Sequence, residues 1–178
     1  MTYTKTQLSA AERILKSAQK VQKGKPALHT TWEGREGQYL TDGFRAARIK
    51  EKMPLPVLWG VHVGKFTYPD LDAFIDPLTN SIAPMVHLPL PAKKDLRAFI
   101  KAERKRLFEM GERPIPRWEF GHGLPWVNAQ YLLDMMDLLP GCTALYPEGR
   151  SDHEPIYFTA KNGDGILLPV MTNHKDKK

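Results

Sequence analysis

The sequence predicts an α+β protein in which amphipathic helices pack on antiparallel sheets. Two kinds of observation support this prediction. Three stretches carry helical spacing, at residues 6 to 23, 92 to 110 and 128 to 139, and short strand-like runs joined by turns precede and follow them. Separate groups of strands and helices are typical of the α+β class.

The first helix is predicted over residues 6 to 23, with Thr6 or Ser9 as its N-cap and Gly24 closing it. Its apolar residues recur at steps of three and four, at Leu8, Ala11, Leu15, Ala18 and Val21. This periodicity gives the helix one apolar face that can pack on the rest of the protein.

Strands and irregular connections are predicted after the first helix. Residues 26 to 32 and 37 to 49 resemble strands joined by a turn, and the second strand is expected to run through Thr41, Asp42 and Gly43. Repeated prolines exclude a long helix between residues 50 and 91, so extended and irregular structure is expected there.

The second half is predicted to contain two helices followed by strands. Residues 92 to 110 regain helical spacing before Gly111, and residues 128 to 139 begin at an Asn cap and stop at Pro140. Short strands are expected at 142 to 147, 154 to 160 and 165 to 171, with turns at 147 to 150 and 162 to 165. The pattern of a helix followed by a hairpin therefore occurs at both ends of the chain.

Size and composition indicate a globular protein with a real core. A chain of 178 residues can bury roughly 70% of the surface that its unfolded state exposes, as one domain or a compact pair of half-domains. The single cysteine, Cys142, excludes an internal disulfide and a Cys-rich metal cluster. No signal peptide or membrane-spanning run is recognisable, so a cytoplasmic protein is expected.

The sequence gives no indication of an enzyme. The histidines are scattered without ligand spacing, Cys142 has no identifiable base, and the glycine-rich stretches near residues 122 and 163 are not followed by helices. We therefore expect no catalytic residue, no metal site and no cofactor. A small hydrolase of unrecognised type remains a third possibility that would require clustered acids or histidines.

Two of the predicted helices carry a basic face opposite their apolar face. The first contributes Arg13, Lys16, Lys20 and Lys23, and the second contributes Lys94, Arg97, Lys101, Arg104 and Lys105. One interpretation is that these are ordinary solvated faces. A second interpretation is that they contact the phosphates of nucleic acid without recognising bases. The scarcity of acids on these faces and the net charge of +6 favour this second interpretation.

Four fragments resemble, in order, segments of the bacterial DNA polymerase sliding clamps, the β processivity factors of DNA replication. They are Thr41-Asp42-Gly43-Phe44-Arg45-Ala46, Tyr68-Pro69-Asp70, the segment from Val127 to Asp134, and Ile166-Leu167-Leu168-Pro169-Val170-Met171. The matched positions cover about a fifth of the residues, and they are spread from residue 41 to residue 171. Phe44 stands where the family has His, and Ala46 where it has Leu.

The resemblance implies a DNA-clamp-like processivity fold, with helices lining a ring and sheets outside. It also implies basic side chains that face duplex DNA without sequence preference and a shallow pocket that binds short hydrophobic peptides of polymerases or other clamp clients. Carried over by position, this pocket is lined by Thr41, Gly43, Phe44, Arg45, Leu168, Pro169, Val170 and Met171. The alternative interpretation of Phe44, Leu168 and Val170 is that they are core residues.

The expected function is therefore that of a non-catalytic, sliding-clamp-like DNA-associated protein that tethers a partner through an apolar C-terminal pocket. The clamp-like part is expected at residues 1 to 171 and a polar tail at 172 to 178. The chain is much shorter than a family member, and whether it forms a homo-oligomeric ring is left open. The main alternative is a monomeric clamp-like adaptor that binds protein and does not encircle DNA.

Overall fold

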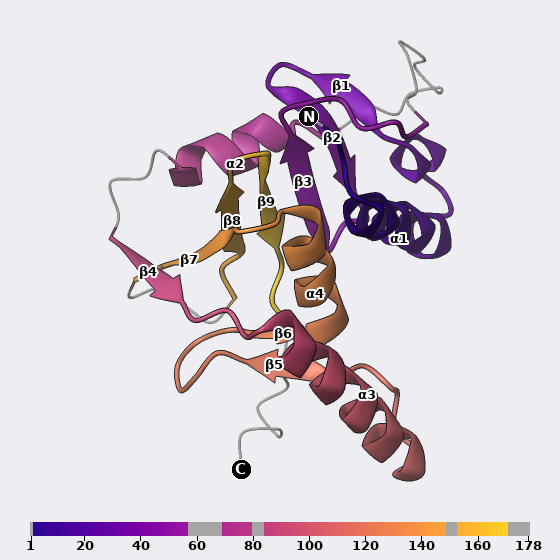
Figure 1. The fold of residues 1–178 in the computed structure, drawn as a ribbon, viewed down its shortest axis with the longest axis vertical. Helices are drawn as coiled ribbons and strands as arrows, with labels where there is room; N and C mark the ends of the chain where they lie inside the picture. The colour runs from indigo at the N-terminus through magenta and orange to yellow at the C-terminus, as the bar shows by residue number, and fades with distance from the viewer. Residues whose placement is uncertain (1, 57–68, 80–83, 149–152, 171–178) are drawn as a thin grey trace.

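The computed structural model describes residues 2 to 56, 69 to 79, 84 to 148 and 153 to 170, and its architecture is α+β (Figure 1). The described residues form four α-helices, a seven-stranded antiparallel sheet and a separate two-stranded sheet. The helices are α1 (Lys5–Val21), α2 (Leu71–Thr79), α3 (Lys93–Glu109) and α4 (Ala129–Leu138), with a short 3₁₀ turn η1 (Pro26–His29). No helix in these ranges combines the length and the apolar character needed to cross a membrane.

The large sheet has the strand order β1-β2-β3-β9-β8-β7-β4. Its strands are β1 (Trp32–Gly34), β2 (Gly37–Thr41), β3 (Arg45–Ile49), β4 (Met85–Leu88), β7 (Thr143–Pro147), β8 (Ile156–Ala160) and β9 (Gly163–Leu167). The small sheet pairs β5 (Arg117–Glu119) with β6 (Trp126–Asn128).

The central part of the fold has an internal two-fold arrangement. Helix α1 is followed by β1, β2 and β3, and helix α4 is followed by β7, β8 and β9. The last strand of each unit meets the other antiparallel at the centre of the sheet, where Arg45 is opposite Leu167 and Ile49 is opposite Gly163. The two helices pack against each other in the same layer. Two similar units of one helix and three strands are thus related by an approximate two-fold axis between β3 and β9.

Helices cover both faces of the large sheet. Leu40, Ala47 and Leu167 belong to the main core beneath α1 and α4, whereas their strand neighbours Tyr39 and Ile166 belong to a second core beneath α2. This alternation follows from the two-residue period of a strand. The molecule therefore has three layers: α2, the sheet, and the layer of α1 and α4, which α3 joins at the side (Figure 1).

Helix α4 lies very close to the sheet at one position on β9. A Cβ atom added to Gly165 would lie 2.4 Å from Cε of Met135 and 2.8 Å from the carbonyl oxygen of Ala46. Both distances are too short for a real contact, so glycine is required there by space. The close packing also places the buried acidic side of α4 next to β3.

The helix boundaries agree with the predicted ranges to within two residues, and the N-cap of α1 differs. Thr4, not Thr6 or Ser9, caps α1: its hydroxyl accepts from the N–H of Gln7 at 3.2 Å, and the Gln7 side chain accepts from the N–H of Thr4. This reciprocal pair is a capping box. Asn128 caps α4 as predicted, accepting from the N–H groups of Gln130 and Tyr131.

Several strand predictions were wrong. Residues 26 to 29 form η1, because Pro26 fixes a helix-compatible φ at its first position. Residues 37 to 49 form two strands, because the chain reverses at Asp42 and Gly43. Within the proline-rich region, residues 71 to 79 form the short helix α2, and β9 begins at Gly163, inside the stretch predicted as a turn.

Candidate functional site

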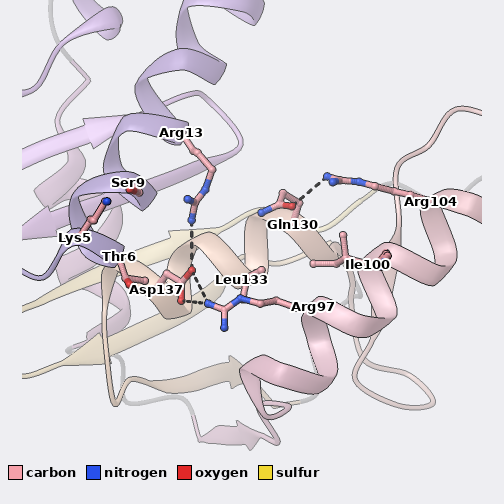
Figure 2. Close-up of a pocket in the computed structure, with 11 residues that line it drawn as sticks. Lys5, Thr6, Ser9, Arg13, Arg97, Ile100, Arg104, Gln130, Leu133 and Asp137 are labelled. Carbon is pink, nitrogen blue, oxygen red and sulfur yellow. Dashed lines mark hydrogen bonds and ion pairs between the residues drawn. The ribbon is translucent and has the colours of Figure 1, made fainter.

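A cavity of about 670 Å³ lies between α1, α3 and α4, and we call it the interhelical cavity (Figure 2). Its lining combines cationic, hydroxyl and apolar side chains. Helix α1 contributes Lys5, Thr6, Ser9 and Arg13, helix α3 contributes Arg97, Ile100, Lys101 and Arg104, and helix α4 contributes Gln130, Leu133 and Asp137.

The structure brings part of the two predicted basic faces together in this cavity. Arg13 reaches it from α1, and Arg97, Lys101 and Arg104 reach it from α3. The other members of the predicted set do not line it and are exposed on the outer surfaces of the same helices or just beyond them: Lys16, Lys20, Lys23, Lys94 and Lys105.

Two arginines of the predicted basic faces are paired with acids, contrary to the expectation that carboxylates are scarce there. Arg13 Nε lies 2.6 Å from Oδ1 of Asp134 and its Nη2 lies 3.4 Å from Oδ2 of Asp137. Arg97 Nη2 lies 3.1 Å from Oδ1 of Asp137 (Figure 2). The sequence places these acids on the third predicted helix, and their pairing with the basic faces was not predicted, because α4 packs between α1 and α3 but is distant in sequence from both.

Two of the outer lysines also form a weak ion pair with an acidic residue one helical turn away. The Lys16 ammonium is 3.8 Å from a Glu12 carboxylate oxygen, and Lys105 is 3.8 Å from Glu109. These are exposed pairs with four-residue spacing, which contribute only a few tenths of a kcal/mol, about 0.3 to 0.5. They leave the outer surfaces of α1 and α3 cationic.

The cavity keeps a surplus of positive charge despite the ion pairs. Asp134 and Asp137 are almost completely buried, and together they are contacted by Arg13, Arg45, Lys93 and Arg97. Arg45 is shared with Asp42, so four cations face three carboxylates. Within the described part of the chain, Lys5, Lys101 and Arg104 have no carboxylate at ion-pairing distance. The arrangement therefore suits an anionic ligand.

A second hollow, which we call the apolar pocket, has a volume of about 490 Å³ and lies on the α2 side of the sheet. Five of the residues predicted for a peptide site line it: Thr41, Gly43, Phe44, Arg45 and Leu168. The rest of its wall is formed by Gln22, Lys25, Leu28, Ala46, Pro69, Leu71, Phe74, Pro155, Tyr157 and Ile166. Phe44, Phe74 and Leu168 are 44%, 58% and 38% exposed, so Phe44 and Leu168 are not core residues.

The other residues predicted for this site are elsewhere. Pro169 and Val170 do not line the apolar pocket, because the chain turns away after Leu168 and the Val170 N–H donates to the Trp126 carbonyl at 2.7 Å. Met171 and the predicted polar tail at 172 to 178 lie outside the described residues.

The turn between β2 and β3 is held in one shape by side-chain hydrogen bonds. Asp42 Oδ1 accepts from the N–H groups of Phe44 and Arg45 at 3.0 and 3.1 Å, and the Thr41 hydroxyl donates to the Arg45 carbonyl at 2.8 Å. Gly43 has φ of +89°, a conformation that strains other residues. This geometry presents Phe44 at the rim of the apolar pocket.

Arg45 and Arg48 point to opposite faces of β3 and attach the sheet to different helices. Arg45 forms buried ion pairs with Asp42 and with Asp134 of α4, and its guanidinium carbon lies 4.1 Å from the centre of the Tyr131 ring. Its side chain is 2% exposed, so its guanidinium contributes to the buried contacts between the sheet and α4 and is not presented to solvent. Arg48 forms ion pairs with Asp72 and Asp76 on the α2 side.

The Arg48 cluster shifts the ionisation of its members. Burial alone would lower the pKa of Arg48, but hydrogen bonds to Asp76, Asp72 and Asp164 raise it. Burial would raise the pKa of Asp72, yet the bonds from Tyr39 and Arg48 lower it below the ordinary value. Burial and its bond to Asp72 raise the pKa of Tyr39 to about 12. The surroundings therefore favour the charged forms of Arg48 and Asp72 and the neutral form of Tyr39.

Sequence reasoning missed several residues of both hollows. Lys5 lies two turns before Arg13 on the same side of α1, so extending the basic face by two turns could have found it. Phe74 belongs to α2, which was not predicted, and no sequence signal indicated it. Tyr131 lines neither hollow, but its ring contacts Phe44 and Arg45 beside the apolar pocket, in a segment that had been matched only for its helix.

Comparison with known proteins gave no match: no family model, no curated protein and no solved structure resembles the chain significantly. Among the described residues, no group of three or more His, Cys, Asp or Glu side chains is placed to hold a metal ion. The two hollows and their charges are therefore the basis for a functional proposal.

Proposed function

We propose that this chain is a non-catalytic, clamp-like DNA-associated protein. Its basic helices contact the phosphates of duplex DNA, and its apolar pocket tethers a partner protein. The observation that carries the proposal is the convergence of Arg13 from α1 with Arg97, Lys101 and Arg104 from α3 on one cavity. Convergence from two helices is not needed for solubility, whereas it concentrates positive charge where a phosphate backbone could bind.

The topology also supports the clamp-like part of the proposal. Two units of one helix and three strands meet at the β3 and β9 pair, and their helices α1 and α4 lie together on one face of the sheet. A clamp places its helices toward DNA and its sheets outward, as the resemblance of the sequence fragments implies. The same layer here carries the basic residues of α1 and, beside it, those of α3.

Duplex binding over a series of salt concentrations tests the proposal. Lys101→Gln with Arg104→Gln removes two cavity cations that have no carboxylate partner among the described residues. Each lost phosphate contact reduces the slope of log affinity against log salt by about 0.9 for duplex DNA, so the double variant should lower it by about 2. Arg97 is unsuitable for this test, because its loss also removes a partner from the buried Asp137.

A matched control comes from the same helix. Arg106 carries the same charge, does not line the interhelical cavity and pairs with Glu103. Arg106→Gln should leave the salt slope unchanged. Equal slopes for the double variant and the control would contradict the proposal.

A second candidate function is that of a monomeric adaptor on the same fold that binds protein and does not encircle DNA. It is favoured by the exposure of Phe44, Phe74 and Leu168 around the apolar pocket, since contiguous apolar surface of this kind marks interaction sites. Sedimentation at high protein concentration separates the candidates. A ring requires an oligomer, whereas a stable monomer without duplex affinity would favour the adaptor.

A further inference from the structure

The interhelical cavity differs in shape from a surface that follows a double helix. Its volume of about 670 Å³ falls within the range of about 300 to 1,000 Å³ that is typical of small-ligand sites. A duplex can bring its phosphates to the exposed Lys101 and Arg104, but its paired and stacked bases cannot enter a hollow of this size. Lys16, Lys20 and Lys23 lie outside the hollow, on exposed surface at the same side of α1 or just beyond its end, and remain accessible to a duplex.

The arginines of the cavity keep unused hydrogen-bond donors. A guanidinium has five N–H donors. Arg13 uses Nε and Nη2 for Asp134 and Asp137, Arg97 uses Nη2 for Asp137, and Arg104 uses Nη2 for the Gln130 side chain. Each therefore has an Nη1 group without an acceptor among the described residues. Donors of this kind suit the oxygens of a phosphate.

Asp137 is acidic, but it holds cationic side chains at the cavity and so keeps the cavity suited to an anion. Arg13, Lys93 and Arg97 all contact this carboxylate, so its charge is more than neutralised. Figure 2 shows Arg13 and Arg97 extending toward it from opposite sides. Asp137 is thus a positioning residue that holds two guanidiniums from different helices near each other.

The cavity also has apolar lining, which a site for phosphate alone would not need. Ile100 of α3 and Leu133 of α4 line it and are otherwise packed in the main core, with 5% and 6% of their surface exposed. Thr6 and Ser9 add hydroxyl groups on the α1 side. Cationic walls beside apolar and hydroxyl groups match a nucleotide, which joins phosphate to a sugar and a base.

We infer that the interhelical cavity binds one nucleotide unit of a single-stranded nucleic acid, with the phosphate against the arginines and Lys101 and the sugar or base against Ile100 and Leu133. The inference rests on the proposed phosphate-binding role of the same helices and adds the ligand class. A free nucleotide has the same chemistry and is the other source of such a ligand.

The test uses the full chain and fluorescence anisotropy. The probes are a labelled oligothymidylate of about 10 nucleotides, within the usual site size for single strands, and a duplex of equal length. ATP and inorganic pyrophosphate serve as competitors. Ser9→Phe fills the cavity without changing its charge, and Gln19→Phe adds the same ring at an exposed position of α1 outside the cavity.

The inference predicts that Ser9→Phe weakens oligothymidylate binding by about tenfold or more and leaves duplex binding within about twofold, while Gln19→Phe changes neither. Thermal unfolding confirms that each variant is folded. If Ser9→Phe lowers the unfolding temperature, Ser9→Asp replaces it, because it adds a repelling charge with little bulk, and the same tenfold loss is expected.

Other outcomes overturn the inference. If the Ser9 variants leave the affinity for oligothymidylate unchanged, a single-strand site in the cavity is excluded. The same conclusion follows if these variants weaken oligothymidylate binding and duplex binding equally. Competition by pyrophosphate as strong as that by ATP excludes a role for the apolar lining, and binding of ATP without binding of the oligonucleotide assigns the site to a free nucleotide.

Single-strand binding without duplex binding upholds the inference and rejects the proposed duplex contact.

Discussion

Arg45 of β3 and Asp134 of α4 form an ion pair in which both side chains are at most 2% exposed. The same carboxylate also accepts from Arg13 at 2.6 Å, and Arg45 also binds Asp42 in the β2 to β3 turn. One buried network therefore links the turn beside the apolar pocket to α4 and to the interhelical cavity.

Replacing Arg45 with Met should destabilise the fold strongly. Removing one partner of a buried ion pair leaves an uncompensated charge and costs about 3 to 5 kcal/mol. Two carboxylates, Asp42 and Asp134, would lose their shared partner. Urea unfolding measures the change, and the exposed Arg106→Gln variant, expected to change stability by about 0.5 kcal/mol or less, is the control. A loss below about 1 kcal/mol for Arg45→Met would show that the network contributes little.

Replacing Gly43 with Ala should cost about 1 kcal/mol or more, because alanine is strained at a φ of +89°. The new Cβ would also lie 2.5 Å from Nε2 of Gln22, which would have to move. Gly24→Ala is the matched control: nothing lies within 4 Å of its added Cβ, so it should be neutral or slightly stabilising. Thermal unfolding of both variants checks the prediction, and equal unfolding temperatures would contradict it.

Stability should fall as the pH rises from 10 to about 12, because of Tyr39. Burial and the hydrogen bond to Asp72 raise the pKa of this phenol to about 12 from an ordinary value of 10. Between these values the unfolded chain has lost the proton and the folded chain still holds it, so raising the pH favours unfolding. Tyr39→Phe should flatten this part of the curve of unfolding free energy against pH. An equally steep fall in the variant would assign the effect to other groups.

Cys142 should react slowly with iodoacetamide at pH 8 in the folded protein. Burial raises the pKa of its thiol to about 11, partly opposed by the charge of Lys93, so little thiolate is present. Lys93→Gln should therefore slow the reaction further. The alkylation rate in denaturant, where the thiol is exposed, provides the reference. An alkylation rate in the folded protein equal to the rate in denaturant would show that the Cys142 thiol is not buried.

The helices were largely predictable from the sequence, whereas several strands were not. The periodicity of apolar residues located α1, α3 and α4 because each buries one continuous stripe, for example Leu96, Ile100 and Leu107 in α3. The boundary between β2 and β3 was missed although Asp42-Gly43 is a dipeptide typical of turns, because the strand was expected to run through it. The hydrogen bonds that Asp42 accepts from Phe44 and Arg45 hold the chain reversal at this point. Local patterns cannot show which residues such bonds join.

The candidate sites were predictable only in part for the same reason. The spacing of Arg13 and Arg97 identified their helix faces, but not the two α4 carboxylates between them, which lie 37 to 124 positions away in the chain. Arg45 was placed in the apolar pocket by its position next to Phe44, and its guanidinium instead turns to the opposite face of the sheet. Which face a strand residue takes depends on the register with β9, which no short motif encodes.

The absence of a side chain at Gly165 has a consequence for the depth of the interhelical cavity. Because β9 offers no bulk there, Met135 of α4 can approach the strand closely, and Asp137 of the same helix contacts Arg13 and Arg97. A bulkier residue at this single position would lift the helix outward and make the hollow shallower without altering any cation. A substitution at Gly165 would thus act on the interhelical cavity from the far side of α4, through a residue that is not part of the cavity lining.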